Sequence, residues 1–87
     1  MTWIYPPELR AALGAFGLAP TGESPPSLVR DALSELYRYE LRRLRGRLLA
    51  GEIAKPDYIG HVVALRKTYW PLTMMPAVWE QVCRPDH

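Results

Sequence analysis

The sequence of 87 residues has little of what most catalytic and metal sites require. It contains one cysteine, Cys83, and two histidines, His61 and His87. A single cysteine excludes an internal disulfide framework and is typical of a reducing compartment. A glycine-rich phosphate loop, a CxxC pair and the motifs around nucleophilic serine or cysteine are also missing. We therefore expect a protein that is not an enzyme, with no catalytic residues, no metal and no cofactor.

The few candidate ligand pairs have simpler interpretations. Asp57 and His61 are four residues apart on a predicted helix, a spacing that allows two ligands to one metal ion. No third ligand lies nearby in the sequence, so a local salt bridge is the preferred interpretation. Cys83 and His87 have the same spacing, but Pro85 between them interrupts a continuous helical face.

Long apolar runs are absent as well. No stretch approaches the roughly 20 apolar residues of a membrane-spanning helix. The residues after Met1 form neither a basic segment nor a long apolar segment, so we expect no signal peptide. A cytoplasmic protein without membrane contact is the expectation. The formal net charge of +2 is too small to indicate nucleic-acid binding by itself.

The residues that are present predict one small helical domain covering 1–87. Hydrophobic residues make up 48% and charged residues 23%, which is ordinary globular usage. Nine prolines favour short elements with defined breaks. Residues 1–6 form an aromatic N-terminal arm in this prediction, and residues 84–87 form a short tail.

The predicted fold class is all-α. The longest segment without proline, about 27–50, is expected to be a central helix. It should run antiparallel to a second helix at about 57–70, which Pro71 ends. Shorter helices are expected at about 7–16 and from Pro76 to about Cys83. The result is a small bundle of three to four helices.

The apolar face of the central helix shifts around its axis between its two halves. Leu33 and Leu36 belong to the first half, and Leu41, Leu44 and Leu48 to the second. Two different partners are expected: the helix at 7–16 for the first half, and the helix at 57–70 for the second.

The helix at 57–70 has two adjacent apolar lines. An apolar arc that wide predicts contact on two sides, with neighbouring helices or with a second subunit. One line consists of Tyr58, Val62, Leu65 and Tyr69, and the other of Ile59, Val63 and Trp70.

Large apolar side chains are numerous for so small a domain. Aromatic residues and arginine are enriched in interface hot spots, and methionine adapts to irregular partners. We therefore expect a protein–protein interaction module: an adaptor, an accessory subunit or a homo-oligomer. Closure of the core is the alternative role for these side chains. The candidate partner-binding residues are Trp3, Tyr5, Tyr69, Trp70, Met74, Met75 and Trp79.

Arginines concentrate in the second half of the central helix. The simpler interpretation is a solvated surface with pairs such as Glu35–Arg38 and Glu40–Arg43. The alternative is a nucleic-acid-binding protein that uses these arginines, with Tyr39 available to stack on bases. The candidate basic stripe is Arg38, Arg42, Arg43, Arg45 and Arg47.

Overall fold

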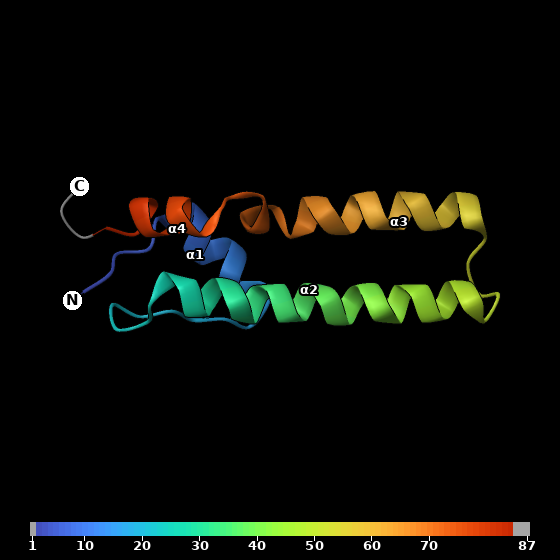
Figure 1. The fold of residues 1–87 in the computed structure, drawn as a ribbon, viewed down its shortest axis with the longest axis horizontal. Helices are drawn as coiled ribbons and strands as arrows, with labels where there is room; N and C mark the ends of the chain where they lie inside the picture. Colours follow the sequence, from blue (N-terminus) through green and yellow to red (C-terminus); the bar gives the residue numbers. More distant parts are fainter. Residues whose placement is uncertain (1, 85–87) are drawn as a thin grey trace.

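The computed structural model describes residues 2–84, and within that range every regular element is a helix (Figure 1). The long helix α2 runs antiparallel to a line formed by α3, η1 and α4, and the chain extends over 50 × 19 × 16 Å. The predicted all-α bundle with one long central helix is thereby confirmed. The elements in chain order are α1 (Pro7–Gly14), α2 (Pro26–Leu49), α3 (Lys55–Thr68), the 3-10 helix η1 (Trp70–Thr73) and α4 (Pro76–Val82).

Proline and glycine set the ends of the helices. Each of the four α-helices has a proline at its first or second position, where the missing N–H costs no hydrogen bond. Gly17 and Gly51 have a positive φ of 79° and lie just beyond α1 and α2. The N–H of Leu18 then donates to the Leu13 carbonyl at 3.0 Å, and that of Glu52 to the Arg47 carbonyl at 2.9 Å. These local signals explain why the predicted bounds lie within a few residues of the observed ones.

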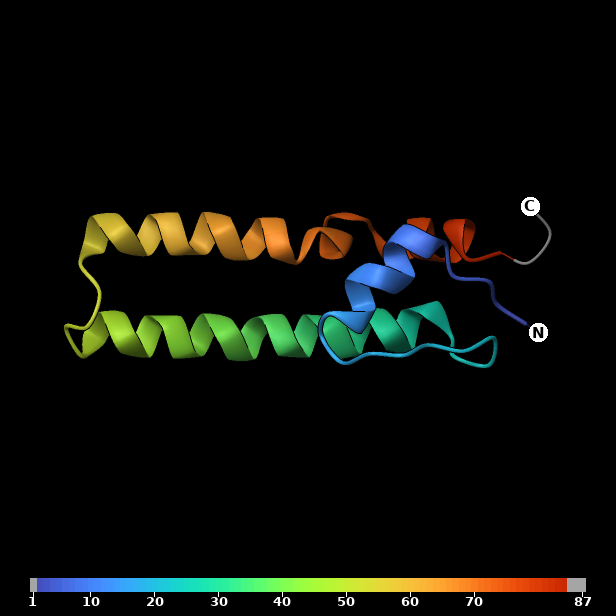
Figure 2. The same cartoon turned by 180° about the vertical axis from the view of Figure 1, so that it is seen from behind.

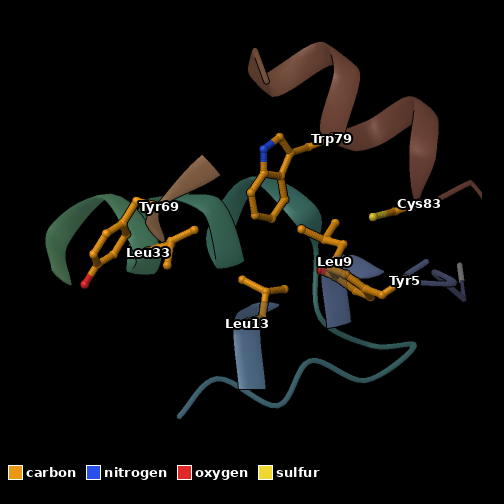
Figure 3. Packing of buried hydrophobic residues seen from close by; sticks show 7 residues of the cluster. All are labelled: Tyr5, Leu9, Leu13, Leu33, Tyr69, Trp79 and Cys83. Atoms are coloured by element: carbon orange, nitrogen blue, oxygen red, sulfur yellow. The ribbon is translucent and has the colours of Figure 1, made fainter. Parts of the chain in front are cut away.

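One end of the molecule contains the hydrophobic core (Figure 3). The Trp79 side chain projects from α4 into the cluster, is fully buried, and donates its Nε1–H to the Pro71 carbonyl at 2.8 Å. We call residues 2–36 and 69–84 the head, and residues 37–68 the arm. The core cluster lies in the head and consists of Tyr5, Leu9, Leu13, Leu33, Tyr69, Trp79 and Cys83.

The packing of α2 differs in part from the prediction. Its second half pairs with α3, as expected. Its first half lies mainly against α4 and η1, whereas the helix at 7–16 was the expected neighbour. The reason is that α3, η1 and α4 continue in one line back along α2 (Figure 1). The short α1 instead crosses obliquely between α2 and α4 on one side of the molecule (Figure 2) and supplies Leu9 and Leu13 to the core.

The N-terminal segment is bound to the head rather than free. The N–H of Trp3 donates to the Gly22 carbonyl at 2.8 Å, and that of Ile4 to the Cys83 carbonyl at 3.0 Å. The Tyr5 hydroxyl donates to the Ser24 carbonyl at 2.6 Å. Of the predicted tail, Arg84 is exposed, and residues 85–87 lie outside the described residues.

A single arginine joins the two sides of the head. The Arg30 side chain donates from Nε to the Met74 carbonyl at 3.0 Å and from Nη2 to the Leu72 carbonyl at 3.2 Å. The Leu72 carbonyl belongs to η1, and the Met74 carbonyl belongs to the short connection between η1 and α4. Arg30 therefore anchors that connection to α2, a role that the sequence pattern did not indicate.

Candidate interaction surface

Three of the predicted partner-binding residues belong to the core. Tyr5, Tyr69 and Trp79 are 2%, 3% and 0% exposed. This corrects their prediction as partner contacts, because a small domain uses its largest side chains to exclude water from its interior. Trp3 and Met74 are half-buried against the same core. Trp70 and Met75 remain exposed, at 39% and 69%.

The phenol of Tyr69 marks the junction of head and arm. Its ring stacks on Phe16 with centroids 4.2 Å apart, and Tyr37 packs against it at 5.2 Å. Burial raises the pKa of Tyr69 well above its ordinary value, and the hydrogen bond and negative charge of Glu40 raise it further. The Glu40–Arg43 pair predicted from the sequence is not formed.

The arm buries very little of its surface. No side chain of α3 is buried, and in the whole arm only Leu44 and Ile53 are. Ile59 is 66% exposed and Val63 is 45% exposed. Of the two sides on which α3 was expected to make contact, only the side facing α2 is covered.

One side of the arm is a groove between α2 and α3. Leu44, Ala64 and Leu65 form its apolar part, and its other lining residues are charged or polar. The connection from α1 to α2 lies over the same side of α2. Residues of this connection line a depression together with Val29. Val29 is 14 residues before Arg43, which is about four helical turns, so the two residues lie on the same side of α2. We call this side the polar groove; it is lined by Glu40, Arg43, Leu44, Arg47, His61, Ala64, Leu65 and Thr68.

The opposite side of the arm is apolar. Two residues along a helix correspond to about 200° around its axis, so Ile59 and Val63 lie opposite His61 of the polar groove. Leu41 lies opposite Arg43 for the same reason. α1 is behind the hairpin in Figure 1 and in front of it in Figure 2, so the side toward the reader in Figure 1 carries no covering element. We call this side the open face and define it by Leu41, Leu48, Ile59, Val62 and Val63.

Trp70 lies just beyond the C-terminal end of α3. The backbone leaves helical geometry at Tyr69, which has φ −94° and ψ 35°. Helical register therefore does not fix the side on which Trp70 lies, and it is not counted in the open face. Its partial exposure places an aromatic side chain at the end of the arm that adjoins the head.

The five predicted arginines are all exposed but do not form one stripe. By register Arg38 and Arg45 border the open face, Arg43 and Arg47 line the polar groove, and Arg42 points away from α3. Arg38 forms the predicted pair with Glu35 at 2.6 Å, the one salt bridge among the described residues. The Arg43 guanidinium lies 5.9 Å from the Tyr39 ring centroid.

Charge is divided unequally between the two parts of the molecule. Residues 37–68 contain eight of the eleven Lys and Arg but three of the nine Asp and Glu. The arm is therefore strongly basic, while the rest of the chain is mildly acidic. This asymmetry is hidden in the small overall net charge.

The predicted Asp57–His61 salt bridge is not formed in the structure. Both residues line a shallow depression near the α2–α3 turn with Arg47 and Glu52. Between residues 2 and 84, no group of three or more His, Cys, Asp or Glu side chains is placed to hold a metal ion.

Comparison of the chain with protein-family models, with curated proteins and with solved structures found no match. Among the helices of residues 2–84, none combines the length and the apolar character needed to cross a membrane.

Proposed function

We propose that the protein is a non-enzymatic protein–protein interaction module and that the open face of the arm is its binding surface. The observation that carries this proposal is that α3 has two apolar lines and no buried side chain. An adaptor, an accessory subunit and a self-associating protein are all members of this class. A cytoplasmic location, supported by the single reduced cysteine, is part of the same proposal.

The physical support is the geometry of two packed helices. Each helix can cover only one side of the other, so a third element is needed to bury an apolar arc as wide as that of α3. Ile59 and Val63 would transfer their exposed area from water to such an element, which is the main source of association free energy. Ile59 and Val63 are exposed, and Leu41, Leu48 and Val62 beside them are half-buried. Exposed apolar side chains grouped in this way are characteristic of interaction sites.

Nucleic-acid binding is the second candidate, and the basic excess of the arm favours it. Arg42, Arg43 and Arg47 lie away from the open face and are accessible to phosphate groups. This function predicts an affinity that falls steeply as salt rises. It leaves the exposure of Ile59 and Val63 unexplained, so the protein partner is preferred.

The test is native mass spectrometry of the protein purified at low salt from its own source. The test variant is Ile59→Glu with Val63→Glu, which places two charges on the open face. The matched control is Leu28→Glu with Met75→Glu, since these side chains are 62% and 69% exposed and lie in the head. Circular dichroism checks that both variants fold.

We expect a protein complex or a defined oligomer for the wild type and the control, and its loss for the test variant. An unchanged complex in the test variant would contradict the proposal. Attached oligonucleotide mass, lost when Arg42, Arg43 and Arg47 are replaced by glutamine, would support the second candidate instead.

A further inference from the structure

The open face combines an apolar strip with basic borders, and this combination points to the chemistry of its partner. We propose, on the basis of the interaction function above, that the open face binds an acidic amphipathic helix of another protein. The partner helix lies along the arm as a third helix beside α2 and α3.

The shape of the open face suits a helix. Leu41 and Leu48 are seven residues apart on α2, and Ile59 and Val62 are three apart on α3, so two apolar rows run along the arm. A third helix that presents apolar residues at spacings of three and four packs into the groove between such rows. From Lys55 to Lys67 the arm offers about 18 Å of length at 1.5 Å per residue, which is enough for more than three turns.

The charges around the apolar rows all have the same sign. On α2, Arg38 and Arg45 each precede a leucine of the open face by three residues. On α3, Arg66 and Lys67 follow Val62 and Val63 by four. Arg38 is paired with Glu35, but no carboxylate between residues 2 and 84 lies within ion-pair distance of Arg45, Arg66 or Lys67.

This charge pattern discriminates between possible occupants. A helix with glutamate or aspartate beside its apolar stripe would place carboxylates opposite Arg45 and Lys67, which steers association and fixes orientation. A second copy docked by a two-fold axis would set the same basic borders against each other. Nucleic acid would place phosphates and water against Ile59 and Val63, so the apolar surface of these side chains would not be removed from water. The acidic helix satisfies both the apolar and the charged parts of the surface.

The test uses designed peptides of about 18 residues, long enough to span the face at 1.5 Å per residue. The first has leucine at heptad positions a and d and glutamate at the flanking positions. The second has the same leucines with lysine in place of glutamate. The third keeps the glutamates and replaces the leucines by serine. Fluorescence anisotropy of labelled peptides measures the dissociation constants.

We expect the first peptide to bind, and the second and third to bind at least about tenfold more weakly, a difference of about 1.4 kcal/mol. Ile59→Glu should abolish binding of the first peptide, whereas Leu28→Glu, in the head, should leave it unchanged. In the charge-reversal variant Arg45→Glu with Lys67→Glu, the preference should invert in favour of the lysine peptide. That inversion is the decisive result, because loss of folding cannot produce it.

Three results would overturn the inference. The first is equal affinity for the acidic and basic peptides, and the second is no binding of the acidic peptide up to about 1 mM. The third is a homodimer or an oligonucleotide complex that Ile59→Glu with Val63→Glu abolishes. If a native complex depends on Ile59 and Val63 but the peptides do not discriminate by charge, the proposed function stands and only the acidic partner is wrong. If the native complex is unchanged when both residues are replaced by glutamate, both proposals fail.

Discussion

The head and the arm are both built from helices that carry apolar residues, yet only the head has a substantial core. In the head, the N-terminal segment, α1, α2, the end of α3 and α4 all converge on Trp79 (Figure 3). In the arm, two helices meet alone, and α3 buries no side chain. The two regions differ in the number of segments that meet, and much less in the apolar content of each segment.

This comparison shows what an apolar pattern does and does not establish. Tyr69 and Ile59 both lie on apolar lines of the same predicted helix. The first is 3% exposed because Phe16 and Tyr37 cover it, whereas the second is 66% exposed because nothing does. Periodicity identifies the side of a helix that can be buried, and the number of surrounding segments decides whether it is.

The sharpest test compares two tryptophans of the head that differ in burial, Trp79 in the core and Trp70 at the border with the arm. Trp79→Ala should lower the free energy of unfolding by about 3–5 kcal/mol, because it leaves a cavity and removes one of the two donors to the Pro71 carbonyl. Trp70→Ala should lower it by less than about 1 kcal/mol, since its side chain is partly in water. Urea denaturation followed by far-UV circular dichroism measures both. Equal losses would mean that Trp70 is as important to the core as Trp79.

The second test concerns the hydrogen bonds from Arg30 of α2 to the Leu72 and Met74 carbonyls. Arg30→Met should cost about 1–3 kcal/mol, because the Leu72 and Met74 carbonyls lose their donor while the apolar stem of the side chain is preserved. Arg45→Met is the matched control in the arm, where no hydrogen bond to the described chain is lost, and its cost should be close to zero. The same urea titration compares the two. An unchanged free energy of unfolding for Arg30→Met would show that water replaces the guanidinium as the hydrogen-bond donor without loss of stability.

The third test uses alkaline pH. Burial, with a smaller contribution from Cys83, raises the pKa of Tyr5 from 10.0 to about 12. The unfolded chain therefore loses this proton at lower pH than the folded chain, so stability is full below about pH 10 and falls between pH 10 and 12. The raised pKa of Tyr69 adds to the same fall, and the raised pKa of Cys83 extends it toward pH 9.

The measurement is the urea midpoint as a function of pH for the wild type and Tyr5→Phe. Phenylalanine keeps the buried ring and removes the titrating hydroxyl, together with its bond to Ser24. The variant should begin less stable at neutral pH and lose less stability between pH 10 and 12. Identical slopes for the two proteins would contradict the assignment of this titration to Tyr5.

The smallest effect is expected in the arm. Ile59→Ala should change the free energy of unfolding of the free protein by less than about 0.5 kcal/mol, because a half-exposed surface site loses little burial. Leu44→Ala, at the buried contact between α2 and α3, should cost about 2–5 kcal/mol. Thermal unfolding at several protein concentrations measures both variants. A large, concentration-dependent loss for Ile59→Ala would show that the open face is already covered by a second copy.

The helices could be predicted because their ends depend on local signals. Pro26 begins α2 and Gly51 ends it, and both act through the conformation of their own backbone. The function of Arg30 could not be predicted in this way. Its acceptors are 42 and 44 residues away, so no spacing along α2 indicates them.

The candidate site was predictable only in outline. The second apolar line of α3, with Ile59 and Val63, already indicated contact on a second side. The predicted set of partner-binding residues was partly wrong, because Tyr5 and Trp79 are buried in a core formed by segments that are distant in the sequence. The five arginines do not form one stripe for a similar reason. Their surroundings depend on the position of α3, which leaves two at the border of the open face, two in the groove and Arg42 pointing away.

The hydrogen bond from the Ile4 N–H to the Cys83 carbonyl has a mechanical consequence. It brings nearly opposite ends of the described chain together at the end of the molecule farthest from the α2–α3 turn (Figure 1). A pulling force applied at Ile4 and Cys83 is therefore borne by this bond and by the core around Trp79. The tip of the arm lies outside that load path, so tension on the chain would leave the geometry of the open face unchanged until the head itself yields.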